Sequence, residues 1–148
     1  MNNITISEAR ITLGALLRKP YETLQTQVYA GLAARGFADI RPAHSSVFRY
    51  IKPEGSRVSD LAERAEITKQ SLAYVAGNLA DLGYVSIEPD ATDARAKLVI
   101  LTERGRQVSE ALVELSAGLE AQCAVRMGPE KLGQLRTILA ELAVAMTD

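Results

Sequence analysis

Residues 67–85 constrain the fold of this chain more than any other segment. Apolar side chains recur there at the spacing of one helix face: Leu72, Val75, Ala76, Leu79 and Leu82. The opposite face carries polar and small residues, with Ser71 and Asn78 on its flank: Gln70, Ala73, Tyr74, Gly77 and Asp81. Thr68 is a good N-cap, and Gly83 is a good stop. The segment therefore predicts a helix from about Lys69 to Leu82 whose polar side is free for a partner.

The neighbouring residues predict what surrounds this helix. Ser59 is suited to cap a short helix that ends near Ala65, and residues 66–67 leave only a tight connection. Residues 84–88 and 96–101 are rich in Val, Ile and Leu, which favours two strands, and the polar stretch between them favours a hairpin turn. A short helix, a second helix and a hairpin carrying Arg95 and Lys97 form the layout of a winged helix-turn-helix. In that module the second helix enters the DNA major groove, and the hairpin can reach an adjacent minor groove.

Long apolar stripes flank this central part at both ends. Residues 7–35 predict a helix with Pro20 inside, either as a new helix that starts there or as one kinked helix. Pro42 suits the start of a further short helix. Thr102 is predicted to cap a long helix that Gly128 and Pro129 separate from a last one.

Such stripes would be too exposed in a monomer, so we expect a homodimer. The predicted fold class is mainly α with a small β-hairpin wing. We expect one domain over residues 1–148, with a winged helix-turn-helix lobe at 41–102 and a helical dimerisation lobe from 7–36 and 103–147.

Composition limits the remaining function classes. The net charge is −1, and residues 44–104 contain eight Lys or Arg against nine Asp or Glu, which argues against nonspecific coating of DNA. No apolar run approaches the roughly 18–20 residues that span a membrane, and we expect a cytoplasmic protein. One His and one Cys cannot form a Cys/His zinc site, and no catalytic constellation or phosphate loop is present in the sequence. We therefore expect no enzyme activity, no metal and no cofactor, and an inert thiol at Cys123.

Six segments, taken together, resemble the MarR family of bacterial transcriptional regulators: residues 41–50, 58–65, 68–71, 82–85, 93–97 and 101–105. The resemblance covers roughly residues 13–146. It implies a homodimer that usually represses genes and, in many members, releases DNA when a small phenolic or other aromatic anion binds. It also implies a wing motif, Asp-x-Arg, matched here by Asp93 and Arg95. Tyr74 and Asn78 stand where many members carry Arg, so operator preference should differ.

The candidate DNA contacts lie in two groups. The recognition-helix group is Thr68, Lys69, Gln70, Ser71, Tyr74 and Asn78. The wing group is Asp93, Arg95 and Lys97. The alternative interpretations are a solvated helix face and a charged hairpin tip. Arg18, Tyr21 and His44 are candidates for an effector pocket. Dimer-interface packing would explain Arg18 and Tyr21 at least as well, and a structural hydrogen bond near the start of its short helix explains His44 better.

These patterns favour a sequence-specific regulator that binds a pseudo-palindromic site in double-stranded DNA, acting as a repressor that a small aromatic or phenolic effector releases. The alternative is a winged-helix module for protein interaction or effector binding that does not bind DNA. The acidic balance of the central segment motivates that alternative.

Overall fold

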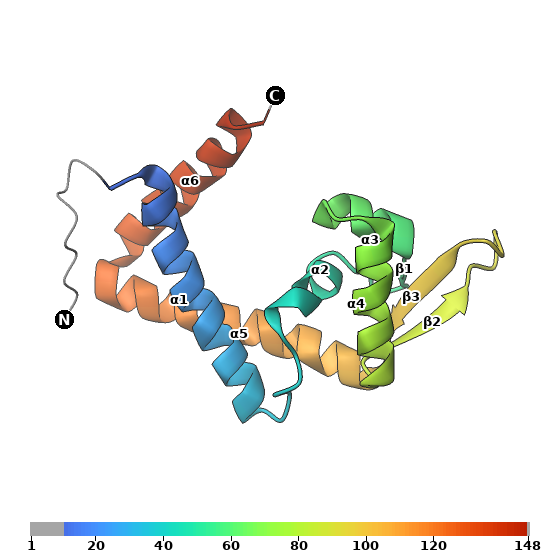
Figure 1. The fold of residues 1–148 in the computed structure, drawn as a ribbon. Helices are drawn as coiled ribbons and strands as arrows, with labels where there is room; N and C mark the ends of the chain where they lie inside the picture. The colour runs from blue at the N-terminus through green and yellow to red at the C-terminus, as the bar shows by residue number, and fades with distance from the viewer. Residues whose placement is uncertain (1–10, 148) are drawn as a thin grey trace. The chain divides into compact units, whose positions relative to one another are not determined.

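The computed structural model describes residues 11–147 of the chain (Figure 1). Its elements in chain order are α1 (Leu13–Ala34), η2 (Pro42–His44), α2 (Ser45–Phe48), β1 (Ser56–Arg57), α3 (Val58–Ala65), α4 (Lys69–Asp81), β2 (Val85–Pro89), β3 (Lys97–Leu101), α5 (Glu103–Met127) and α6 (Pro129–Ala145). The fold class expected from the sequence, mainly α with a β-hairpin wing, is confirmed.

The first helix is one continuous element. α1 runs through Pro20 without a break and is capped by Thr12, whose hydroxyl accepts a hydrogen bond of 3.1 Å from the N–H of Ala15. Of the two alternatives for Pro20, a single helix is therefore the correct one. The expected start near Ser7 lies outside the described residues.

The wing contains a strand that the sequence did not reveal. β1 is two residues long and pairs antiparallel with β3, so the sheet order is β1-β3-β2. Arg57 lies in β1 opposite Leu98 and also occupies the N-cap position of α3. The prediction that Ser59 caps this helix was therefore wrong, because the chain passes directly from the strand into a helix that begins at Val58.

The chain divides into two compact units, residues 1–112 and 113–148, and the boundary falls inside α5. The core of the first unit brings together side chains from α1 through α5. Its largest fully buried members are Tyr84, Leu32, Leu61, Leu72, Leu79, Val47, Val99 and Val108. The apolar face predicted for α4 supplies Leu72, Ala76 and Leu79 to this core. The division into DNA-binding and dimerisation lobes remains a prediction.

Tyr84 joins three segments of the first unit. Its phenol donates a 2.5 Å hydrogen bond to Oδ1 of Asp39, and burial raises the pKa of that phenol. The guanidinium of Arg104 lies 5.0 Å from the centre of the Tyr84 ring and 5.3 Å from that of Phe37. The loop after α1, the start of β2 and the start of α5 therefore meet at one aromatic cluster.

Backbone contacts fix the start of α5 on the same cluster. The N–H of Thr102 donates to the carbonyl of Tyr84 at 3.0 Å, and the Thr102 hydroxyl donates to the carbonyl of Gly83 at 2.7 Å. The same hydroxyl oxygen accepts from the N–H of Gly105 at 3.2 Å, which confirms the predicted cap. A Cβ on Gly105 would collide with the Tyr84 carbonyl oxygen, so only glycine fits there.

The second unit, residues 113–148, consists of the last part of α5 and α6. Gly128, with φ of 95°, separates the helices as the Gly-Pro pair predicted, and Arg136 forms an ion pair with Glu120. α6 has no buried residue, and its apolar side chains stay open, with Ile138 59% exposed. None of the helices in residues 11–147 combines the length and apolar character needed to cross a membrane.

We expect Gly105→Ala to destabilise the protein by about 1–3 kcal/mol, because a rigid backbone carbonyl must move to admit the methyl group. Urea unfolding measures this change. Gly77→Ala is the matched control, since nothing lies within 4 Å of a Cβ at that helical position. The control should be more stable by about 0.5–1 kcal/mol. Equal effects at the two sites would contradict the close contact at Gly105.

Candidate nucleic-acid interface

A tight turn joins α3 to α4. Glu66 adopts the left-handed conformation, with φ of 56° and ψ of 40°, and the N–H of Ile67 returns to the carbonyl of Ala62 at 3.0 Å. Thr68 then caps α4, and its hydroxyl oxygen accepts the N–H of Ser71 at 3.0 Å, as predicted. α3 and α4 therefore form a helix-turn-helix in which the buried face of α4 is fixed and its other face is open.

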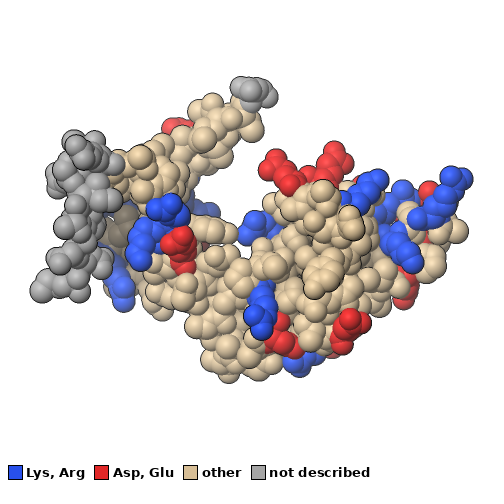
Figure 2. Space-filling model, in the orientation of Figure 1, with Lys and Arg blue, Asp and Glu red and all other residues tan. Residues whose placement is uncertain are grey.

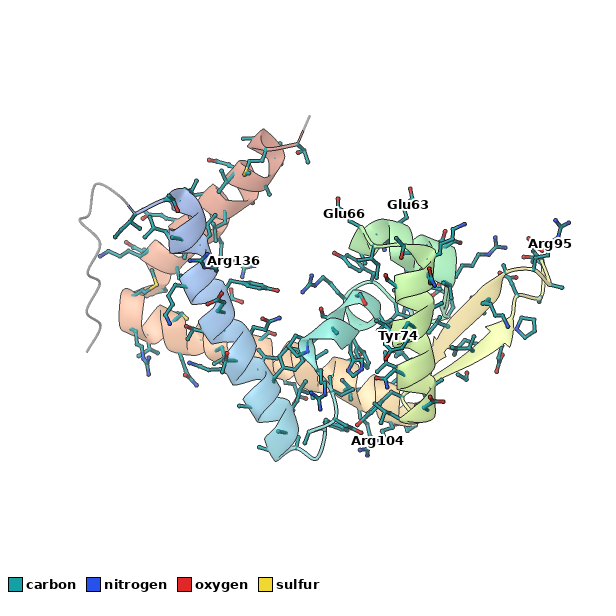
Figure 3. All side chains as sticks on the ribbon, in the orientation of Figure 1. Glu63, Glu66, Tyr74, Arg95, Arg104 and Arg136 are labelled. Carbon is teal, nitrogen blue, oxygen red and sulfur yellow. The ribbon has the colours of Figure 1, made fainter. Side chains whose placement is uncertain are left out.

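The open face of α4 carries the residues predicted to contact DNA. Lys69, Gln70, Tyr74 and Asn78 are all exposed, and Tyr74, on the outer side of the helix, is 80% exposed (Figure 3). Thr68 and Ser71 are exposed as well, but the Thr68 hydroxyl donates to Oγ of Ser71 at 2.9 Å. These two side chains are thus partly engaged in the cap. An exposed aromatic side chain on a polar helix face is available for contact with a partner.

His44 lies beneath this face instead of in an open pocket. Its side chain is 4% exposed, and Nε2 lies 2.7 Å from Oδ1 of Asn78. Nδ1 accepts a 2.9 Å hydrogen bond from the N–H of Arg41. His44 is thus bonded to the recognition helix. The two residues lie 34 positions apart in the chain, so no local sequence pattern predicts their contact.

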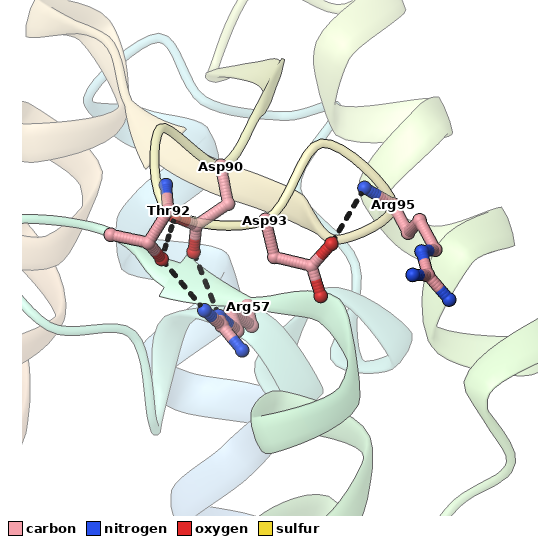
Figure 4. A network of polar contacts seen from close by, with 5 residues as sticks. All are labelled: Arg57, Asp90, Thr92, Asp93 and Arg95. Atoms are coloured by element: carbon pink, nitrogen blue, oxygen red, sulfur yellow. Dashed lines mark hydrogen bonds and ion pairs between the residues drawn. The ribbon is translucent and has the colours of Figure 1, made fainter.

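The base of the wing is fixed by Arg57, which sequence reasoning missed. Its Nε donates to Oδ2 of Asp90 at 2.7 Å, and its Nη2 donates to the hydroxyl of Thr92 at 3.1 Å (Figure 4). Asp90 in turn accepts from the N–H and the hydroxyl of Thr92 at 2.8 and 2.7 Å. The hydrogen bonds from Thr92, followed by that from Arg57, lower the pKa of Asp90 from 3.8 to about 2.

The Asp-x-Arg motif forms the turn at the wing tip. Oδ1 of Asp93 accepts the backbone N–H of Arg95 at 3.0 Å (Figure 4). The Asp93 carbonyl accepts the N–H of Ala96 at 2.9 Å. Asp93 therefore fixes the backbone of Arg95, while the Arg95 side chain extends from the tip of the wing (Figure 3). Lys97 is exposed at the first position of β3.

Charge is unevenly distributed over the first unit. Figure 2 shows blue Lys and Arg side chains on the wing and red acidic side chains at the end of α3. The acidic pair there is Glu63 and Glu66, which are exposed at the end of α3 (Figure 3). The wing is balanced in its charge count, because Arg57, Arg95 and Lys97 are matched by three acidic residues: Glu88, Asp90 and Asp93. Its positive charge lies at individual side chains, with Arg95 at the tip.

The residues predicted to bind an effector do not contact one another but have different partners. Arg18 forms an ion pair of 3.8 Å with Glu22 on the same helix, and the Tyr21 hydroxyl accepts from Nη2 of Arg49 at 3.5 Å. Arg49 was not among the predicted site residues. A cavity of about 470 Å³ lies elsewhere, between Tyr50, Lys52, Arg64 and the wing base. Among residues 11–147, no group of three or more His, Cys, Asp or Glu side chains is placed to hold a metal ion.

A helix-turn-helix followed by a β-hairpin, which pairs with a short strand that precedes it, defines the class of winged-helix proteins. Residues 38–96 match the family model described as the MarR family. The chain is 37% identical over 60 residues to the transcriptional activatory protein BadR of Rhodopseudomonas palustris, an overlap of 40% of this chain and 34% of BadR. The chain thus spans about a third of the length of that relative.

Solved structures agree with this assignment at the level of the fold. The repressor CouR bound to a 23-mer DNA duplex superposes with a TM-score of 0.77 at 20% identity, over 96% of this chain and 99% of that one. A MarR-family regulator from Rhodococcus sp. RHA1 gives a TM-score of 0.69 at 20% identity, over 92% and 95% of the two chains. CouR from Rhodococcus jostii RHA1 has also been solved with p-coumaroyl-CoA, with a TM-score of 0.68 at 20% identity over 92% and 94%.

Residues 38–96 thus match the MarR family model, and the resemblance expected from the sequence motifs is confirmed. The family model and the relatives named above describe transcriptional regulators and not enzymes.

The wing base should be sensitive to acid. Because Asp90 has a pKa of about 2 in the folded chain against an ordinary 3.8, its contribution to wing order is complete above about pH 4. That contribution is lost as the pH falls through 2. Carboxyl ¹³C NMR should give a midpoint near 2 for Asp90, and the Thr92 amide signal should shift over the same range. In Asp90→Asn that amide shift should disappear. A midpoint near 3.8 would contradict the Asp90–Thr92–Arg57 network.

Proposed function

We propose that the protein is a transcriptional regulator that binds a specific sequence in double-stranded DNA and works in the cytoplasm. The observation that carries the proposal is the open face of α4, with Tyr74 80% exposed, on the same small unit as a wing that ends in Arg95. A helix of this kind fits the major groove, and an arginine at a hairpin tip fits the minor groove.

The two groups of residues would do different work. Gln70, Tyr74 and Asn78 can contact base edges through hydrogen bonds and thymine-methyl contacts, which supply sequence preference. Lys69, Arg95 and Lys97 can contact phosphates or a narrow minor groove, and Thr68 and Ser71 place the positive end of α4 near a phosphate. Asp93 supports Arg95 through the backbone of the turn.

We also propose a homodimer bound to a pseudo-palindromic operator. Apolar side chains along α1 and α6 remain open in the single chain, including Leu16 at 56% and Ile138 at 59% exposure. A second copy with two-fold symmetry would cover such stripes. Two-fold symmetry then requires half-sites about 10 bp apart, one helical turn of DNA. A footprint that protects one asymmetric half-site at saturation would contradict this arrangement.

Release of a repressor by a small ligand is the mode of regulation that we favour. CouR, whose fold this chain shares, is named a repressor and has been solved with a p-coumaroyl-CoA ligand. BadR is named an activatory protein, so activation is the competing mode. A small aromatic or phenolic effector would contact Arg18 and Tyr21, with Arg49 as the partner of Tyr21. His44, the third residue considered for this pocket, is buried and bonded to Asn78, so such a ligand would not reach it.

Substitutions on the helix and on the wing should have different effects on DNA binding. Gln70→Ala and Tyr74→Ala should each cost about 1–3 kcal/mol on the preferred site and little on scrambled DNA, because a base contact is lost. Arg95→Ala should weaken binding to both DNAs and flatten the salt dependence by about one unit of slope if a phosphate contact is lost. Titrations at two salt concentrations measure both effects.

Matched controls come from the second unit. Arg126→Ala and Gln122→Ala remove the same side-chain types from exposed positions in residues 113–148 and should leave binding unchanged. Wild-type binding by Gln70→Ala and Tyr74→Ala would contradict the role of the α4 face. If Arg95→Ala is silent as well, the protein-interaction module becomes the better interpretation.

Sedimentation at micromolar concentration should give a species of twice the 16.0 kDa chain mass. Ile138→Glu should shift it to the monomer, because a charge would then be buried in the apolar interface. Tyr74→Glu, which introduces the same charged side chain at an exposed residue on α4, should remain dimeric. A wild-type species of 16.0 kDa alone would rule out the homodimer.

A further inference from the structure

The contact between His44 and Asn78 has a defined donor and a defined acceptor. The N–H of Arg41 can only donate, so Nδ1 of His44, 2.9 Å away, accepts and carries no proton. The neutral ring must then carry its proton on Nε2. Nε2 therefore donates, and the atom of Asn78 that faces it at 2.7 Å is Oδ1. The backbone of Arg41 thus selects the tautomer that orients the Asn78 amide.

This orientation determines which hydrogen-bonding group of Asn78 is turned towards a partner. Asn78 is exposed on the same face of α4 as Ser71 and Tyr74, at helical spacings of seven and four residues. The contact uses one of the two lone pairs of its oxygen and turns that oxygen towards a histidine that is 4% exposed, so the amide nitrogen is the group turned towards a partner. That nitrogen has two hydrogens and can only donate.

A side chain that only donates and an amide that both donates and accepts prefer different base edges in the major groove. A free Asn matches adenine by accepting from N6 and donating to N7, whereas guanine offers two acceptors, N7 and O6, and no donor. An amide fixed by its oxygen fits guanine better than adenine. It fits cytosine worst, because cytosine presents a donor.

We propose that His44 is a positioning residue that sets base preference: by holding Oδ1 of Asn78, it makes this recognition-helix residue a donor that selects guanine. The inference rests on the proposed DNA binding. It concerns which base is preferred at one position of each half-site, and it leaves the rest of the interface unchanged.

The experiment measures binding to a panel of operators in which each position carries each of the four bases. Wild type should prefer guanine at one position per half-site by roughly 5- to 100-fold, and Asn78→Ala should abolish that preference alone. His44→Asn keeps an acceptor for Arg41 N–H but is too short to reach Asn78, so its preference should move towards adenine. His44→Gln can donate to Asn78 and should restore guanine. Nonspecific affinity should be the same in all four proteins.

Two further readouts avoid substitution of the buried histidine. Asn78→Asp keeps an acceptor for His44 and presents an oxygen outward, so the preferred base at this position should change from guanine to cytosine. Long-range ¹H–¹⁵N NMR of the wild type should show His44 protonated on Nε2 and unprotonated on Nδ1. The opposite tautomer would overturn the proposal whatever the variants do.

Failure of the inference and failure of the proposed function give different results. If the wild type binds no DNA, both fail. If it binds a specific site and His44→Asn keeps the guanine preference that Asn78→Ala abolishes, DNA binding stands and the positioning role of His44 is wrong. If Asn78→Ala leaves the base profile unchanged, Asn78 does not select a base. If the double variant with His44→Asn and Asn78→Ala has a different base preference from Asn78→Ala alone, His44 affects base preference other than through Asn78.

Discussion

The close approach of Gly105 to the Tyr84 carbonyl is the contact on which the geometry of the first unit depends. It lets the first turn of α5 lie directly against the connection between the recognition helix and β2. The same carbonyl accepts the N–H of Thr102, and the Tyr84 phenol reaches Asp39 in the loop after α1. Because these bonds are buried or backbone-based, they resist small displacements. The end of α4 and the start of the wing are therefore fixed relative to each other, which DNA contacts in two grooves require.

Several carboxylates of this near-neutral module are engaged in internal hydrogen bonds. Asp90 binds Arg57 and Thr92, Asp93 binds the backbone of Arg95, and Asp39 accepts from Tyr84. Each of these bonds uses an acidic group to shape the unit. The charge count of the sequence does not show where the charged side chains lie: Arg95 extends outward at the wing tip, and Glu63 and Glu66 lie at the end of α3. Local placement of charge, more than net charge, decides whether DNA is attracted to a given surface.

The polar residues on α4 differ in how much freedom they retain. Tyr74 and Gln70 are exposed, and ordering them against DNA costs conformational entropy. Asn78 is held in advance by His44, and Thr68 and Ser71 are held by the cap. A fixed amide selects between bases by its donor and acceptor pattern at lower entropic cost than a free one. The recognition helix thus combines adaptable and fixed contacts, and the fixed contact depends on a residue 34 positions away in the chain.

Local patterns were sufficient to predict α4, its Thr68 cap, the hairpin and the Gly-Pro break, because helical period, capping and turn chemistry act over a few residues. They also identified the exposed residues of α4 and the wing turn. They did not predict β1, because two residues carry no periodicity, or the start of α3 at Val58, which follows from the pairing of Arg57 with Leu98. The partners of His44, Tyr21, Tyr84 and Arg57 were likewise decided only by the tertiary structure. Their contacts join residues 28 to 45 positions apart, and a pattern that spans a few residues does not show which distant residues the fold brings together.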